Sequence, residues 1–206
     1  MSFHDAISDK DGWDTHQRES LFANPYLEIQ RVRVSTPTRP EPFEWTVCHR
    51  KAGVVIAAQT PEGGFVMIRQ ERVPIRRTIW EFPAGQIDEA TGHTWEAIVA
   101  TGLRELQEET GYELAAGGEV TPMHHYVSSP GFTDEHCHQI WVRGAVPGAR
   151  GMALDPNECI TEVRVFSPQE LRGMVAEGLV CDANTLSCLA RLAALTPLWS
   201  EEVVRL

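Results

Sequence analysis

A proline-free stretch from Thr94 to Thr110 constrains the fold most, because it predicts one long helix between segments that alternate like strands. Apolar residues recur along it at helical spacing: Ala97, Ile98, Ala100, Leu103 and Leu106. Thr94 is placed to cap its start and Gly111 to end it. Gly102 lies in the interior, where glycine costs about 1 kcal/mol relative to alanine. We therefore expect packing against other elements to hold this helix.

The segments on both sides of the helix predict the rest of the fold. Strands are expected over residues 27–34, 43–48, 53–58 and 65–68 before it, and over 123–127, 138–146 and 162–166 after it. Two helices follow, over 168–177 and from 182 or 183 to 195, and the second is capped by Asp182 or Asn184. The phase of alternation slips at Gln30 and Arg31, which predicts a bulge there. This order predicts an α/β protein, an α/β/α sandwich with a mixed sheet.

The chain of 206 residues fits one domain with an additional set of strands. Residues 1–24 are polar and acidic, and we expect a loosely held arm. Residues 25–50 form a predicted antiparallel β-extension, and residues 51–199 form the main domain.

Composition excludes several classes of protein. The net charge of −11 argues against nucleic-acid binding, because no basic surplus is present to neutralise phosphates. Apolar runs are too short to span a membrane, and the N-terminal sequence does not resemble a secretory signal. The five cysteines are scattered without a CxxC pair, which indicates reduced thiols. We therefore expect a cytoplasmic protein that binds neither nucleic acid nor membrane.

The long helix carries a group of glutamates. Glu105 and Glu109 are four residues apart, so their carboxylates lie on one helical face, with Glu108 beside them. Like charges at this spacing repel, whereas a divalent cation reverses the sign of that interaction. Mg²⁺ prefers carboxylate oxygens and keeps open positions for phosphate oxygens. The alternative interpretation is a solvated acidic face.

Sequences around these glutamates favour the metal site over the solvated acidic face. Trp80-Glu81-Phe82-Pro83-Ala84-Gly85 precedes the helix, and Arg104-Glu105-Leu106-Gln107-Glu108-Glu109-Thr110-Gly111-Tyr112 lies within and after it. Over residues 25–195 the chain resembles the Nudix hydrolase family, whose box contains Arg-Glu-U-x-Glu-Glu-x-Gly-U, where U is apolar. Ten residues separate Gly85 from Glu96, where the family pattern has five. Glu96 is therefore either a box residue or only a helix-start residue.

The resemblance implies a set of metal ligands for Mg²⁺, with Mn²⁺ as an alternative ion. Glu105 and Glu109 would be the principal ligands, Glu108 would contribute, and the carbonyl of Ala84 would complete the site. Arg104 would brace the box by pairing with a glutamate.

A second motif points to the substrate. Ser129-Pro130-Gly131-Phe132-Thr133-Asp134-Glu135 is similar to a loop of the ADP-ribose pyrophosphatase branch of that family. The resemblance implies substrate contacts from Gly131 and Phe132, and from Arg72 as a fork on the diphosphate. Trp45 is a candidate for stacking on adenine, although an aromatic residue in a strand is more often part of a core.

The resemblance also implies a glutamate, on a loop before the last strand, that binds the metal or activates water. Glu158 is at the matching position of this sequence. Glu135 and Glu162 remain alternative bases. The predicted activity is Mg²⁺-dependent hydrolysis of ADP-ribose to AMP and ribose 5-phosphate. Alternatives are another nucleoside diphosphate sugar, such as UDP-glucose or GDP-mannose, or a non-catalytic regulator that binds a nucleotide sugar. The β-extension of this branch often crosses to a second subunit, so a homodimer is expected.

Overall fold

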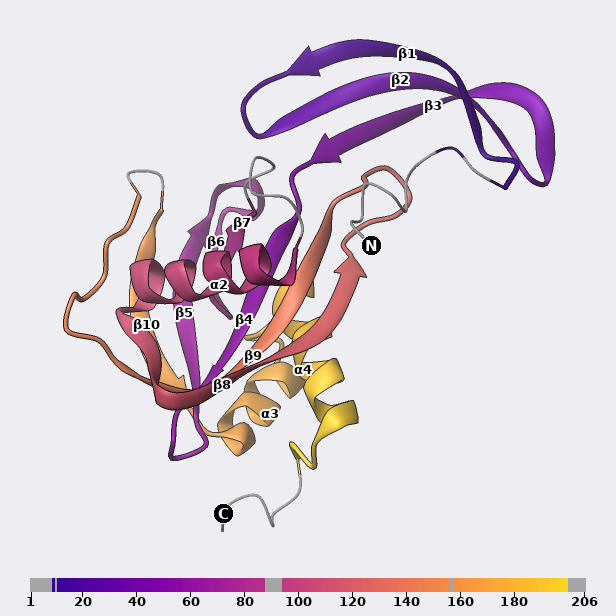
Figure 1. Cartoon of the computed structure of the whole chain (residues 1–206). Coiled ribbons are helices and arrows are strands. Elements are labelled where there is room, and N and C mark those ends of the chain that lie inside the picture. The colour runs from indigo at the N-terminus through magenta and orange to yellow at the C-terminus, as the bar shows by residue number, and fades with distance from the viewer. Residues whose placement is uncertain (1–8, 10, 88–93, 156–157, 200–206) are drawn as a thin grey trace.

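The computed structural model describes residue 9 and residues 11–87, 94–155 and 158–199, and it contains two β-sheets (Figure 1). The first is an antiparallel sheet of β1 (Asp14–Ala23), β2 (Leu27–Thr36) and β3 (Arg39–Arg50). The second contains β4 (Gly53–Gln59), β5 (Phe65–Arg72), β6 (Arg77–Glu81), β7 (Ala84–Gln86), β8 (Tyr112–Val127), β9 (His136–Pro147) and β10 (Ile160–Phe166). The helices are α2 (Trp95–Thr110), α3 (Pro168–Ala176) and α4 (Ala183–Leu195), and η1 (Val73–Ile75) is a 3₁₀ turn.

The second sheet is mixed, as predicted. Its strand order is β10-β5-β4-β9-β8, with β6 paired to β5 and β7 paired to β4. β4 and β9 run parallel, whereas the other pairings in this sheet are antiparallel.

Side chains of β4 alternate between two hydrophobic cores, one on each face of this sheet. Val54 and Ile56 belong to the core that contains Ile98 and Leu106 of α2. Val55 and Ala57 belong to the other core, which includes residues of α3 and α4: Leu171, Met174, Cys188, Leu189 and Leu192. Figure 1 shows α2 on one side of the strands and α3 and α4 on the other. Helices cover both faces, which confirms the predicted α/β/α sandwich.

The ends and interior of α2 agree with the prediction. The Thr94 hydroxyl accepts a hydrogen bond from the Ala97 amide at 3.2 Å, and Gly111 ends the helix at φ 73°. A Cβ atom at Gly102 would lie 2.5 Å from Cδ1 of Ile140 on β9. The glycine therefore lets the helix approach the sheet closely, and this packing offsets its low helix propensity.

The N-terminal segment differs from the loose arm expected for residues 1–24. Asp14–Ala23 forms β1 and pairs with β2, whereas residues 1–8 and 10 lie outside the described residues. Nine of the ten residues in β1 are exposed, so pairing uses backbone hydrogen bonds and leaves no apolar pattern to detect.

The predicted bulge at Gln30 and Arg31 is wrong. β2 pairs with β3 without a shift from Leu27 to Val34. The register shifts lie instead in β1, between Thr15 and Gln17 and between Ser20 and Phe22. As a result, the apolar residues of β2 lie on both faces of the first sheet.

The chain contains five free cysteines, as their scattered positions predict. Among the helices that the structure describes, none combines the length and the apolar character needed to cross a membrane.

Candidate active site

A split in the second sheet creates the main cavity. β4 and β5 pair directly only at Gln59 and Phe65. Further along, β7 pairs with β4 and β6 pairs with β5, so the two central strands diverge. The cavity that opens there has a volume of about 1460 Å³. It is large enough for an extended ligand with two sugar groups.

Three carboxylates converge on the wall of this cavity. Glu105 and Glu109 come from successive turns of α2, and Glu158 comes from the segment before β10. One oxygen atom from each lies within 4.8 Å of the others. Glu105 and Glu109 are 7% and 3% exposed, so their charges are largely removed from water. Among the described residues, no other group of three acidic, histidine or cysteine side chains meets this spacing.

Burial sets the electrostatics of the cluster. Desolvation raises the pKa of Glu109 to about 8, against a hydrogen bond from the Ala84 amide at 3.0 Å that favours the charged form. Repulsion from Glu105 and Glu158 contributes to this increase. Burial likewise raises the pKa of Glu105, although Arg104 opposes the change. Buried carboxylates that repel one another fit a site for a divalent cation, which favours their charged forms.

Gly85 allows α2 to present these ligands close to the sheet. A Cβ atom at this position would lie 2.0 Å from the carboxyl carbon of Glu105. The glycine of the Pro-Ala-Gly run is therefore required because Glu105 packs directly against its backbone. Ala84, whose carbonyl is a predicted metal ligand, lines the same cavity.

Arg104 braces the glutamates, as the sequence predicts. Its guanidinium donates to Glu105 at 2.6 Å and also to Glu108 one turn later. Glu108 is not part of the converging group of three carboxylates, so its predicted role as a metal ligand stays a prediction.

Arg72, the predicted diphosphate ligand, also lines the cavity. Its Nε donates to both oxygens of Glu81, at 2.8 and 3.1 Å, and its Nη2 donates to Oε2. Glu81 is only 2% exposed, whereas the Arg72 side chain is 39% exposed. The pair therefore joins a buried carboxylate to a guanidinium that reaches the cavity.

The other predicted substrate-binding residues lie elsewhere in this chain. Trp45 Nε1 donates to the Gly131 carbonyl at 3.1 Å, and the Cys48 amide donates to the Phe132 carbonyl at 2.7 Å. Trp45 and Phe132 are about half exposed. These residues join the Ser129–Glu135 loop to β3, but Trp45, Gly131 and Phe132 do not line the cavity.

The three candidate bases have different surroundings. Glu158 lies in the acidic cluster and accepts a hydrogen bond from the Asp155 amide at 2.8 Å. Glu135 lines the cavity but is engaged by Arg50 at 2.7 Å and by the Ser128 hydroxyl at 2.8 Å. Glu162 lies on β10, where it faces Arg69 at 3.8 Å, and it does not line the cavity.

Three further carboxylates of the cavity, Glu81, Asp155 and Asp182, were not predicted as site residues. Glu81 carried a usable signal, because a charged residue inside an apolar strand needs a partner. Asp182 was predicted only as a helix cap, and its Oδ1 does accept from the Thr185 amide at 2.7 Å. Burial raises the pKa of Asp182 to about 6, and the nearby charge of Glu81 adds to the shift.

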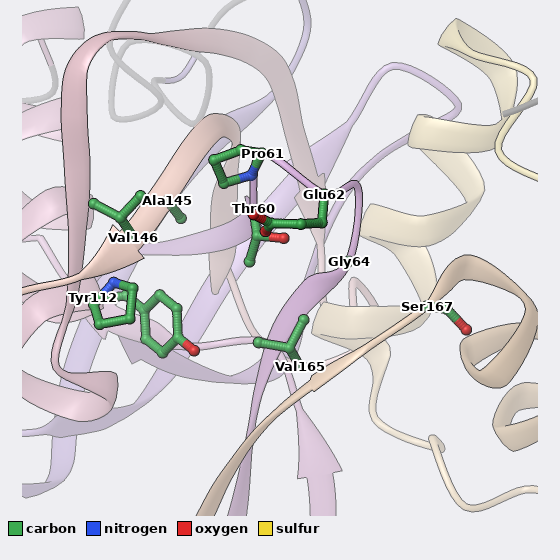
Figure 2. A pocket seen from close by; sticks show the side chains of 10 residues that line it. Thr60, Pro61, Glu62, Gly64, Tyr112, Ala145, Val146, Val165 and Ser167 are labelled. Atoms are coloured by element: carbon green, nitrogen blue, oxygen red, sulfur yellow. The ribbon is translucent and has the colours of Figure 1, made fainter. Parts of the chain in front are cut away.

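A second pocket of about 470 Å³ lies where the β4–β5 turn, the start of β8 and the end of β10 meet (Figure 2). Thr60 and Glu62 of the turn stand opposite Tyr112 and Val165. Glu62 is the one carboxylate among the ten residues that line it, so this pocket does not offer a comparable ligand set.

Comparison with known proteins identifies the class of protein to which this architecture and acidic cluster belong. A family profile described as the NUDIX domain matches residues 49–184, and the chain therefore belongs to the Nudix family. Within that family it is a pyrophosphohydrolase of the ADP-ribose pyrophosphatase-like branch, as its similarity to an ADP-ribose pyrophosphatase shows.

The chain is 31% identical over 171 residues to the ADP-ribose pyrophosphatase of Bacillus subtilis (strain 168), covering 83% of this chain and 87% of the relative. It is 30% identical over 172 residues to the methanol dehydrogenase activator of Bacillus methanolicus, covering 84% and 88%. The crystal structure of an ADP compounds hydrolase has the same fold, with a TM-score of 0.73 at 14% identity over 90% of this chain and 94% of that one. The family and the first of these relatives support hydrolysis of nucleoside diphosphate compounds.

Proposed function

We propose that this protein hydrolyses the diphosphate bond of ADP-ribose to AMP and ribose 5-phosphate in the presence of Mg²⁺, with Mn²⁺ as an alternative ion. The observation that carries the proposal is the convergence of Glu105, Glu109 and Glu158 on a cavity that Arg72 also lines. The similarity to the ADP-ribose pyrophosphatase of Bacillus subtilis supports this choice of substrate.

The residues divide the chemistry between holding the metal, holding the substrate and moving a proton. Glu105, Glu109 and Glu158 would hold Mg²⁺, with Ala84 and Glu108 as further ligands. Bound Mg²⁺ neutralises diphosphate charge and lowers the pKa of a coordinated water. Glu158, or alternatively Glu135, would accept the proton of the attacking water.

Arg72 would hold the diphosphate, because a guanidinium fork matches phosphate oxygens. Catalysis would then depend mostly on positioning and on stabilisation of charge. A non-catalytic regulator is a weaker candidate, because this chain keeps all the box glutamates of α2 and brings two of them together with Glu158. UDP-glucose and GDP-mannose remain alternative substrates, because their diphosphate would make the same contacts.

The test is a panel of substrates offered to the purified protein with Mg²⁺: ADP-ribose, UDP-glucose, GDP-mannose, NADH, diadenosine polyphosphates and 8-oxo-dGTP. We expect the highest kcat/KM with ADP-ribose and AMP as the released nucleotide. The NADH arm matters because one relative is named as the activator of a dehydrogenase. A preference for a triphosphate, or for a uridine or guanosine sugar, would contradict the proposed substrate.

The metal site is tested separately with Glu109→Gln. We expect kcat to fall by several powers of ten and the Mg²⁺-induced rise in Tm to disappear, because the amide cannot supply a charged ligand. Stability without metal should stay level or rise slightly, because Glu105 loses a like-charged neighbour. Glu119→Gln, at an exposed position on β8 that does not line the cavity, is the matched control and should keep activity. Near-normal activity of Glu109→Gln at saturating Mg²⁺ would favour the regulator.

A further inference from the structure

One wall of the cavity is a single face of the β5–β6 hairpin. Gln70 and Arg72 lie on this face of β5, and Ile79 and Glu81 lie on the same face of β6. These four side chains all line the cavity. Glu81 pairs in register with Ile68, so Arg72 is four residues, or about 13 Å, further along its strand. The Arg72 side chain must therefore extend back along the wall to reach Glu81.

Glu81 is positioned to hold that extended conformation. Its carboxylate is almost fully buried, which costs free energy unless it is paired. Arg72 supplies the pairing through Nε and Nη2, and two contacts along one edge determine the plane of the guanidinium. Among the described residues, Nη1 makes no comparable hydrogen bond, so the other edge of the guanidinium is available for a ligand.

The surroundings of Arg72 connect this pair to the acidic cluster. Arg72 interacts electrostatically with Glu109 of α2 and with Asp182 at the start of α4, in addition to Glu81. A guanidinium released from Glu81 would have other carboxylates to contact, as well as solvent. The buried carboxylate therefore selects one of several positions that Arg72 can adopt.

We propose that Glu81 is a positioning residue that holds Arg72 along the cavity wall, so that the open edge of the guanidinium binds the diphosphate of the substrate. This inference rests on the proposed function, because it assigns a diphosphate ligand to the cavity. Glu81 acts only through Arg72 and does not contact the substrate. A purely structural role, in which the pair only joins β5 to β6, predicts different kinetics.

The test is a double-mutant cycle with Glu81→Gln, Arg72→Ala and the double variant, measured on the panel compound that the wild type hydrolyses best. Glu81→Gln should raise KM about tenfold and change kcat less than about twofold, because ground-state binding is weakened. Arg72→Ala should raise KM at least as much. The double variant should match Arg72→Ala within about twofold, because Glu81 has no role once the guanidinium is gone.

Glu119→Gln is the matched control, because it removes an exposed carboxylate paired with Arg143 that does not line the cavity. Its KM should equal that of the wild type. Glu81→Asp serves as a second variant if Glu81→Gln does not fold, since it keeps the charge but withdraws the carboxylate by one methylene. It should also raise KM, with a normal Mg²⁺-induced rise in Tm.

Unchanged KM in Glu81→Gln or in a folded Glu81→Asp would overturn the inference, and so would a further increase when Glu81→Gln is added to Arg72→Ala. Failure of the proposed function looks different, because the wild type would then hydrolyse none of the panel compounds.

Discussion

At the scale of single residues, the cavity is controlled by the burial of carboxylates. Glu105, Glu109 and Asp182 have raised pKa values because the protein removes the water that stabilises their charge. Glu81 is more deeply buried than Asp182, but Arg72 supplies it with charged hydrogen bonds. Buried carboxylates in the same cavity therefore differ in the partners that they contact.

Asp182 gives a prediction about pH. Its pKa rises from the ordinary 3.8 to about 6 on folding, so the folded state holds the proton more tightly than the unfolded state. Stability should fall as pH rises from about 4 to about 6, with the full cost present above that range. Asp182→Asn keeps a good helix cap and removes the ionisation. In urea unfolding without metal, we expect this variant to be about 1–3 kcal/mol more stable than the wild type at pH 8. The difference should vanish near pH 4, and a pH-independent difference would contradict the assignment.

The choice of base gives a second prediction. Glu158→Gln should lower kcat by about 10²–10⁴-fold, because Glu158 lies in the acidic cluster where the attacking water would be activated. Glu162→Gln should change kcat by less than about twofold, because Glu162 faces Arg69 outside the cavity. Steady-state kinetics at saturating Mg²⁺ measures both. Equal and mild effects would leave Glu135 as the leading base.

At the scale of elements, α2 combines a local signal with a close tertiary contact. Its first and last residues are set by Thr94 and Gly111, which act through neighbouring backbone groups. Its position against the sheet depends instead on two glycines, Gly85 on β7 and Gly102 within the helix. Both glycines let α2 pack against the sheet at a distance that a Cβ atom at either position would prevent.

Matched glycine substitutions test this packing. Gly102→Ala should destabilise the protein by about 1–3 kcal/mol, because the added Cβ atom would lie 2.5 Å from the buried Cδ1 of Ile140. Gly173→Ala in α3 makes the same chemical change where nothing lies within 4 Å, and it should stabilise by about 0.5–1 kcal/mol. Denaturant unfolding measures both. Similar effects at the two sites would show that helix propensity, and not packing, decides the outcome.

At the scale of the whole molecule, the three-stranded sheet extends beyond the main body of the protein (Figure 1). Large apolar side chains of this N-terminal region are about half exposed or more: Trp13, Phe22, Tyr26 and Trp45. Phe22 and Trp45 lie on opposite faces of this sheet, and exposed apolar groups on both faces indicate that another protein covers this region. Tyr26 also lines the cavity, which links this region to the candidate active site.

We therefore predict that the protein is a homodimer in solution, with this sheet in the interface. Light scattering should give twice the mass of the chain. Deletion of residues 1–50 should leave the protein insoluble or inactive, because it removes the first sheet. A fully active monomer would contradict this prediction.

Local sequence determined the features that depend on neighbouring residues. The spacing of Glu105 and Glu109 places both on one helical face whatever surrounds the helix. The caps at Thr94 and Asp182 and the strands with buried apolar faces follow from the same kind of local signal. The first strand lacked such a signal, because its side chains are exposed and only its backbone is paired.

Tertiary structure alone decided which distant residues meet. Glu158 joins two glutamates that precede it by about fifty positions, and Arg72 finds Glu81 across a hairpin. Trp45 and Phe132, both candidate substrate contacts, lie outside the cavity of the single chain. Such contacts depend on how strands pair and on how much apolar surface each pairing buries. These are properties of the whole chain, so the spacing of residues within one segment does not encode them.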